Sequence, residues 1–312
     1  MKRVGLVLAL ALLAAAAPAS AQTPTPPSAP TLAFSIGNGI RDSHRTWELT
    51  GEAVQIRGVL RPYVPGQKVR FDLLSGGRHV ATKVVHVGAR GIFRLKLVPH
   101  RAGNYTIRAT HAATPQQAAA TATQKFGAIA GDGHHGGEDV RLLQVGLARL
   151  GYATSMGGRW DSATALAVLT FRSVNNLSRN STADRGVFLR LFRGQGGYRL
   201  RYPRAGRHVE FSWTHQVLIL ADHGRPQLMF HTSSGKPSTP TVFGHFHFYS
   251  KVPGTLPDGM FDSNFFIGGY AVHGYPSVPT YPASHGCIRV NNLNAPEIFA
   301  WIKIGMSIYS YR

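Results

Sequence analysis

The sequence predicts a multidomain protein with three folded parts in series: a β-sandwich, a small three-helix bundle and a β-rich C-terminal domain. Two observations lead to this fold class. Apolar and polar residues alternate from residue 32 to 129, which is typical of half-buried strands, and from residue 138 apolar residues recur at the spacing of one helix face. The strand-like alternation returns after residue 200. A chain of 312 residues also has room for two or three domains.

The first residues have the pattern of an export signal. Lys2 and Arg3 precede a long apolar run, and Ala19-Ser20-Ala21 offers small residues for cleavage. We therefore expect residues 1–21 to be a signal peptide and the Pro- and Thr-rich residues 22–31 to be an extended linker. An uncleaved signal that remains as an anchor is the alternative. The expected location is secreted or cell-wall-associated, and periplasmic if the source has an outer membrane.

Residues 32–129 are predicted to form an antiparallel β-sandwich. Turn residues separate five alternating segments at intervals of about ten residues, as in sandwich domains. These segments are EAVQIRGVL, QKVRFDLL, HVATKVVHV, GIFRLKLV and NYTIRATH. The pattern resembles the disulfide-free immunoglobulin-like modules of bacterial proteins, and this resemblance implies a spacer or interaction module.

Residues 131–197 are predicted to form three short helices after a Gly-rich break. The first should begin at Glu138, the second should have Asp161 as its N-cap, and the third should run from about Thr182 to Leu191. LLQVGLARLGY and DSATALAVLTF resemble the peptidoglycan-binding repeat, although the segment after Asn176 lacks its usual Asp-Gly-x-x-Gly. The resemblance implies a wall-binding module, and a bundle that no longer binds glycan is the alternative.

Residues 200–312 are predicted to form the β-rich domain. HVEFSWTHQVLILADHGRPQLMFHTS predicts two strands around a hairpin at His223-Gly224, and FGHFHFYS and NFFIGGYAVHG predict one strand each. A helix is expected at Ala295–Ile302 and a last strand at Met306–Tyr311.

The only cysteine of the sequence, Cys287, has neighbours that indicate nucleophilic catalysis. His273 and His285 are candidate bases, because a nearby imidazolium lowers a thiol pKa and favours the reactive thiolate. Cysteines of exported proteins normally pair, so a single one is expected to be kept for its reactivity. A buried structural cysteine is the alternative, and it fits poorly with flanking His, Gly and Arg residues.

Four nearby residues are candidates for holding a substrate. Gly286 would let backbone N–H groups approach a substrate oxygen, as an oxyanion hole requires. Arg289 carries a planar guanidinium that can hold a carboxylate through two parallel hydrogen bonds. Ser284 and Tyr270 are the other two candidate substrate-binding residues.

AVHGYPSVPTYPASHGCIRV resembles the signature of the L,D-transpeptidase catalytic domain: a His-Gly, a loop, and Ser-His-Gly-Cys. HTSSGKPSTPTVFGHFHF resembles another segment of that family. The resemblance implies that Cys287 attacks a peptidoglycan stem tetrapeptide and that an acceptor amine resolves the thioester as a crosslink. In this scheme His273 ionises the thiol, His285 is a secondary positioner, and the N–H groups of Gly286 and Cys287 bind the oxyanion. Gly274 would orient His273 through its carbonyl.

Two other functions remain open. Ten residues separate His273 from Ser284, which is short for the resembled family, and this loop shapes the acceptor side. If water replaces the amine, the same thioester makes the protein an L,D-carboxypeptidase or a hydrolase that removes wall-linked proteins. A non-catalytic wall-binding protein is the second alternative, against which the complete set of Cys, His and Arg residues argues.

The formal charge of +20 is unevenly distributed along the sequence. Residues 22–200 carry a net charge of +14 and residues 201–312 a net charge of +4. Without a nucleic-acid motif, and with an export signal, this charge favours anionic wall polymers or phospholipid surfaces over nucleic acid, and a merely solvated basic surface is the alternative. We expect no metal or organic cofactor, because His134-His135 and the pair His245 and His247 lack further ligands.

Overall fold

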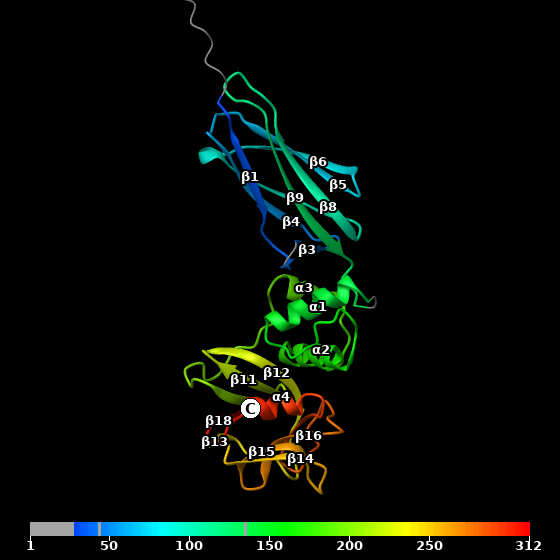
Figure 1. Ribbon diagram of the computed structural model, residues 1–312, viewed down its shortest axis with the longest axis vertical. Helices are drawn as coiled ribbons and strands as arrows, with labels where there is room; N and C mark the ends of the chain where they lie inside the picture. The colour runs from blue at the N-terminus through cyan, green and yellow to red at the C-terminus, as the bar shows by residue number, and fades with distance from the viewer. Residues whose placement is uncertain (1–27, 43–44, 134–135) are drawn as a thin grey trace, which may run out of the picture.

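The computed structural model describes residues 28–42, 45–133 and 136–312, so the expected signal peptide and most of the expected linker lie outside the described residues. The molecule is elongated, with the β-sandwich at one end, the helices in the middle and the C-terminal domain at the other end (Figure 1). Among the described residues, no helix combines the length and apolar character needed to cross a membrane.

The N-terminal domain consists of two sheets. The smaller sheet has the order β1-β4-β7 and the larger one the order β2-β3-β9-β8-β5-β6. The strands are β1 Thr31–Ile36, β2 Ile40–Arg41, β3 Thr46–Leu49, β4 Val54–Arg61, β5 Lys68–Ser75, β6 Arg78–His86, β7 Ile92–Leu97, β8 Gly103–His111 and β9 Ala120–Ile129, with a 3-10 turn at Ala89–Gly91. The five predicted segments coincide with β4 to β8. Prediction missed β1 to β3 and β9; the first half of β9, ATATQ, alternates only small Ala side chains with polar ones, which is a weak strand signal.

The apolar core of this domain lies between its two sheets. Phe71 of the larger sheet packs edge-on against Phe34 and Phe93 of the smaller sheet, with ring centroids 5.7 and 5.4 Å apart. All three side chains are buried. The two sheets therefore form a β-sandwich, and the likeness to immunoglobulin-like modules stays a prediction.

Three helices follow: α1 Glu138–Arg149, α2 Ser162–Val174 and α3 Arg185–Phe192. Asp161 is the N-cap of α2, and its carboxylate accepts the N–H of Thr164 at 2.8 Å. The third helix begins later than predicted because Asp184, rather than Thr182, caps it and accepts the N–H of Val187 at 3.0 Å. Side-chain capping of this kind fixes where α2 and α3 start, whereas α1 begins after Gly137 without a side-chain cap.

The three helices share one apolar core with both neighbouring domains. Phe171 and other helix residues are buried together with Val217 and Met229 of the C-terminal domain and with Ile40 and Leu49 of the sandwich. The helical domain is therefore a packed connector and not an independent unit on flexible links.

The C-terminal domain is built on a nine-stranded sheet with the order β13-β18-β10-β11-β12-β17-β16-β15-β14. Its elements are β10 His208–Ser212, β11 Val217–Asp222, β12 Arg225–Ser233, β13 Gly244–His247, β14 Ser250–Thr255, β15 Phe261–Ile267, β16 Tyr270–Tyr275, β17 Ile288–Asn291, α4 Ala295–Trp301 and β18 Ser307–Tyr311. The predicted helix and last strand are thus present.

Two strand predictions in this domain were wrong in number. The segment read as two strands around His223-Gly224 contains three, because a turn with Gln216 at φ +52° separates β10 from β11. NFFIGGYAVHG was read as one strand, but Gly268, at φ +49°, and Gly269 form a turn between β15 and β16. A positive φ favours glycine, so the second turn had a sequence signal.

Candidate active site

The parallel strands β16 and β17 bring the predicted catalytic residues together. His273 pairs with Arg289 and Val272 with Ile288, and Cys287 directly precedes β17. Cys287 lies in the bend before β17, and the positive charge of Arg289 acts on both Cys287 and His273, so the three side chains are neighbours. Strand β16, which precedes the loop 276–283, and the segment that follows this loop thereby form one site.

Cys287 is a half-buried free thiol. Its Sγ accepts the N–H of Ala271 at 3.4 Å and lies 3.7 Å from the carbonyl oxygen of Gly269, to which the thiol can donate. Burial raises the pKa of Cys287, although the Ala271 N–H and the positive charge of Arg289 oppose the shift. The resting sulfur is therefore favoured as a thiol.

His273 is buried and held in one orientation. Its Nδ1–H donates to the carbonyl of Gly274 at 2.9 Å, which leaves the lone pair on Nε2 to accept a proton. The orienting bond that the sequence implied for Gly274 is thus present. Gly274 also has no room for a side chain, since a Cβ there would lie 2.7 Å from Oδ1 of Asn292.

The resting charge state differs from the imidazolium–thiolate pair that we expected. Burial lowers the pKa of His273, and the nearby Arg289 lowers it further against the bond to Gly274. The pKa of Cys287 moves in the opposite direction. Both shifts disfavour the charged forms, so a neutral thiol beside a neutral imidazole is the favoured resting pair.

The loop that carries Cys287 is closed by hydrogen bonds from Ser284, within the loop, and from Thr241, outside it. Ser284 donates from its hydroxyl to the carbonyl of Cys287 at 2.6 Å and accepts the N–H of Gly286 at 3.1 Å. Thr241 donates to the carbonyl of Gly286 at 2.7 Å. Ser284 is therefore occupied within the loop, and an oxyanion at the Gly286 N–H would have to displace the Ser284 oxygen.

Tyr270 explains why residue 286 is glycine. Gly286 has a φ of +117°, and a Cβ on it would lie only 1.9 Å from Cε1 of Tyr270. A side chain at this position would be strained in its backbone and would overlap the ring. The ring of Tyr270 thus lies against the nucleophile loop, one strand residue before Ala271.

Arg289 lies over an aromatic ring that sequence reasoning missed. Its guanidinium carbon is 3.9 Å from the ring centroid of Tyr275, and the same ring meets His273 edge-on at 5.9 Å. Stacking of this kind holds a guanidinium plane in place while its N–H groups remain able to donate. Tyr275 could have been found from the sequence, because it follows His273 by two residues on one strand and so shares its face.

His285 lies at the surface, unlike His273. Its side chain is exposed, and its Nε2 is 3.5 Å from Nζ of Lys236. His285 and Lys236 therefore lie next to each other at the edge of the loop that carries Cys287. Lys236 was not among the predicted site residues.

The loop 276–283 is fixed by side chains from outside it. Nε2 of His231 donates to the carbonyls of Val278 and Pro279 at 3.3 and 3.2 Å, and Ser233 donates to that of Tyr281 at 2.6 Å. A further bond comes from the helical domain.

Arg179, in the segment between α2 and α3, supplies this further bond. Its guanidinium donates to the carbonyl of Thr280 at 2.8 Å and to that of Thr214 at 2.6 Å. Four consecutive carbonyls, from 278 to 281, are therefore held by side chains, one of them from the neighbouring domain. No sequence signal marks Arg179, because its partners are backbone groups far along the chain.

Metal ligands are not clustered in the part of the chain that the structure describes, where no group of three or more His, Cys, Asp or Glu side chains could hold an ion. His245 contacts Ser307 at 3.0 Å and stacks on Tyr309 with ring centroids 4.3 Å apart. His134-His135 lies outside the described residues.

Comparison with known proteins identifies the family of the C-terminal domain. The sequence profile of the YkuD L,D-transpeptidase catalytic domain matches residues 206–309. A search of curated proteins finds no match. The structure is similar to an L,D-transpeptidase from Xylanimonas cellulosilytica, at 31% identity and a TM-score of 0.53, over 56% of this chain and 94% of that chain.

Two more distant likenesses are to L,D-transpeptidases from Mycobacterium tuberculosis and Stackebrandtia nassauensis. The first has 18% identity and a TM-score of 0.33, over 34% of this chain and 58% of that one. The second has 17% identity and a TM-score of 0.37, over 57% of this chain and 92% of that one. The matched profile and the 31% identical relative both include the C-terminal catalytic domain. Together they place this chain in the L,D-transpeptidase family.

Proposed function

We propose that this protein is an exported cell-wall enzyme that crosslinks peptidoglycan through a thioester on Cys287. The observation that supports the proposal is the pairing of β16 with β17, which brings the oriented imidazole of His273 to the segment that directly follows Cys287. The substrate would be a stem tetrapeptide, cleaved before its terminal D-residue. No metal or organic cofactor is needed for this acyl transfer.

The chemistry starts from the neutral pair. Nε2 of His273 takes the thiol proton as Sγ of Cys287 attacks the carbonyl carbon of the stem peptide. The C–N bond then breaks, and the leaving amine takes the proton from His273. An acceptor amine attacks the resulting thioester, loses its proton to His273, and releases the thiol again. Arg289, held over Tyr275, would bind the carboxylate of the donor peptide.

The upstream domains would hold the enzyme at the wall. Residues 22–200 carry the net charge of +14, and the three helices have the order of the peptidoglycan-binding repeat that their sequence resembles. The immunoglobulin-like sandwich would serve as a spacer that also contacts anionic wall polymers. Retention through charge should weaken as salt shortens the Debye length from about 10 Å at 0.1 M to about 3 Å at 1 M.

Incubation of the purified protein with a disaccharide-tetrapeptide, followed by mass spectrometry, tests the proposed reaction. A crosslinked dimer supports transpeptidation, whereas a tripeptide alone shows that water is the acceptor and that the protein is an L,D-carboxypeptidase. No product from the wild-type protein, or equal product from Cys287→Ala, would overturn the assignment.

A further inference from the structure

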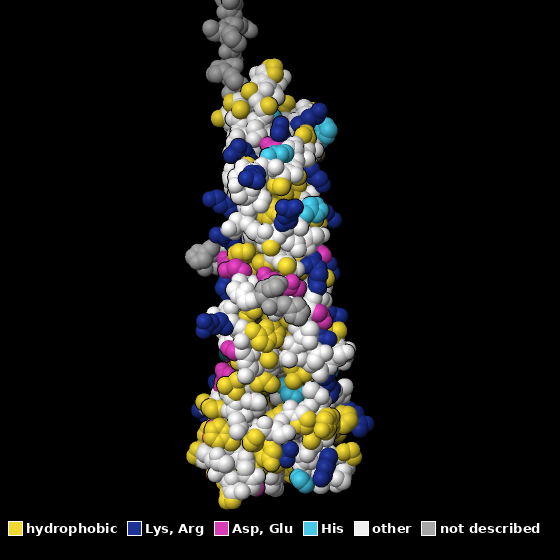
Figure 2. Space-filling model, turned by 90° about the vertical axis from the view of Figure 1, so that its right-hand side faces the viewer, with side chains coloured by type: hydrophobic (Ala, Val, Ile, Leu, Met, Phe, Trp, Pro, Cys, Tyr) yellow, Lys and Arg dark blue, Asp and Glu magenta, His cyan; other side chains and the backbone are white. Residues whose placement is uncertain are grey.

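The sandwich is basic almost everywhere except at its junction with the helices. Residues 31–130 contain fourteen Lys and Arg residues and four Asp and Glu residues. Three of the four acidic residues, Asp42, Glu48 and Glu52, are next to the helical domain, and the fourth, Asp72, is paired with Arg70 at 3.0 Å. Figure 2 shows this distribution, with basic side chains spread over the sandwich and acidic ones gathered near the middle of the molecule.

A cavity of ≈ 310 Å³ lies beside β2, at the edge of this junction. Three cationic side chains from three strands or their ends line it: Arg41, Arg45 and Lys125. Ser35 and Thr46, which carry hydroxyl groups, line the same cavity. We call this set of five side chains the basic pocket.

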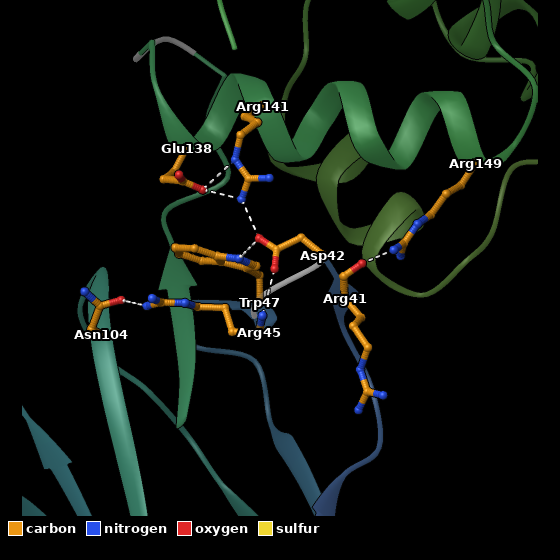
Figure 3. Close-up of polar contacts among 8 residues, drawn as sticks. All are labelled: Arg41, Asp42, Arg45, Trp47, Asn104, Glu138, Arg141 and Arg149. Carbon is orange, nitrogen blue, oxygen red and sulfur yellow. Dashed lines mark hydrogen bonds and ion pairs between the residues drawn. The ribbon is translucent and has the colours of Figure 1, made fainter. Parts of the chain in front are cut away.

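Asp42 also lines the cavity, but its carboxylate is engaged elsewhere. One oxygen accepts the backbone N–H of Arg45 at 2.7 Å. The other accepts Nε1–H of Trp47 at 2.8 Å and the guanidinium of Arg141 at 2.7 Å (Figure 3). Asp42 is thus paired with Arg141 of the helical domain, and three cations beside this single carboxylate leave the lining of the cavity with a net positive charge.

The guanidinium of Arg45 is held in place before any ligand arrives. Arg45 donates to Oδ1 of Asn104 and lies 5.5 Å from the ring centroid of Trp47. The backbone carbonyl of Arg41 accepts a bond from Arg149, while the guanidinium of Arg41 points away from the other residues of the cluster (Figure 3). Preorganised donors bind an anion without the full entropic cost of ordering free side chains.

We propose that the basic pocket binds a phosphate group of a phosphodiester polymer, and that this is how the sandwich contacts the wall. A guanidinium fork fits a phosphate with two parallel hydrogen bonds, and hydroxyl groups can donate to its remaining oxygens. A polymer with repeated phosphates complements the basic surface around the pocket, so neighbouring weak contacts add to the affinity. The inference rests on the proposed retention at the wall and not on the proposed reaction.

Binding of a fluorescent poly(glycerol phosphate) to the full chain tests the inference. The double variant Arg41→Gln with Lys125→Gln removes two pocket charges. Arg94→Gln with Lys68→Gln removes one Arg and one Lys from exposed positions of the same domain, outside the basic pocket, and is the matched control. We expect the pocket variant to bind roughly tenfold more weakly and the control less than about threefold, because only the first loses charged hydrogen bonds.

Several results would overturn the inference. Equal losses in both variants would mean that diffuse charge, without a pocket, binds the polymer. Equal affinity for a poly-glutamate of matched charge would contradict phosphate recognition, and binding only to vesicles of anionic phospholipid would assign the surface to a membrane. Turnover of the disaccharide-tetrapeptide should be unchanged in both variants, so a failed pocket and a failed enzyme are distinguished. Heat unfolding of each variant verifies that these exposed positions leave the fold intact.

Discussion

The two junctions of the helical domain are built differently. On the catalytic side, Met229 is fully buried in the shared core and Tyr152 forms a bridge with it. On the sandwich side, arginines of the helical domain reach across to acidic side chains and backbone carbonyls of the sandwich; they are Arg141, Arg149, Arg185 and Arg193. The stability of the apolar junction with the catalytic domain should not depend on salt. The polar contacts at the sandwich junction lie near the surface, so their strength should depend on salt and pH.

This difference indicates which domains act together. The helices and the catalytic domain share buried side chains, and Arg179 connects them at the loop beside the nucleophile. The sandwich joins the same helices through an apolar contact that is surrounded by ionisable groups. We therefore expect the helical and catalytic domains to unfold as one unit and the sandwich to separate more easily.

The largest effect should come from Met229→Ala. Removing a buried Met side chain costs about 2–5 kcal/mol, because it loses apolar burial and leaves a cavity. The helical and catalytic domains should lose this stability together, in one transition of a urea titration followed by both far-ultraviolet circular dichroism and fluorescence.

Met156→Ala is the matched control, since Met156 is 56% exposed and should change stability by less than about 0.5 kcal/mol. Two separate transitions, with only the catalytic one shifted by Met229→Ala, would show that the shared core does not couple the domains.

At the sandwich junction, Glu48 should make stability depend on pH. Glu48 is 2% exposed, and burial, followed by repulsion from Glu52, raises its pKa from 4.5 to about 8. Between pH 4.5 and about 8, the native state therefore holds a proton on Glu48 that the unfolded state has already released. The free energy of unfolding falls as the pH rises through this range. The slope is at most about 1.4 kcal/mol per pH unit.

Glu48→Gln keeps the shape of the side chain but cannot ionise, so it should flatten this dependence. Heat unfolding of the sandwich across that pH range measures it. The same slope in wild type and Glu48→Gln would exclude Glu48 as the titrating group.

A smaller effect is expected from Arg179→Ala, on activity rather than on stability. The variant loses the bonds to Thr280 and Thr214, so the loop 276–283 becomes less restrained. We expect kcat/KM to fall roughly tenfold, which corresponds to a loss of about 1.4 kcal/mol in transition-state stabilisation. Arg179→Lys should restore part of this loss. Arg193→Ala, at the sandwich junction, is the control and should leave kcat/KM within about twofold of wild type. Equal kcat/KM in Arg179→Ala and Arg193→Ala would show that the loop needs no support from the helical domain.

The sequence predicted the local features of this protein better than its long-range ones. The bond between His273 and the carbonyl of Gly274 was predicted because both residues lie in one short motif whose chemistry is readable from neighbouring residues. The N-cap at Asp161 was found for the same reason. The bond from Arg179 and the shared burial of Met229 depend on which segments meet in space, and no local pattern encodes that.

The charge state of the catalytic pair also could not be read from the sequence. A neighbouring His predicted a thiolate at Cys287, but burial of both side chains favours the neutral forms. Burial is a property of the packed strands β15 to β17, and it decides the direction of both pKa shifts. In the same way, the occupation of the Gly286 N–H by Ser284 follows from the closed loop and not from the motif.

Intact-protein mass spectrometry with a stem tetrapeptide and no acceptor amine tests the central claim most directly. We predict that the wild-type protein gains the mass of the tripeptide acyl group, located on Cys287, and releases the terminal D-residue. His273→Ala should form the same adduct much more slowly, because its thiol has lost the base that takes its proton. Cys287→Ala should form none. An adduct on Cys287→Ala, or an equal rate of adduct formation in His273→Ala, would contradict the assignment of these two residues.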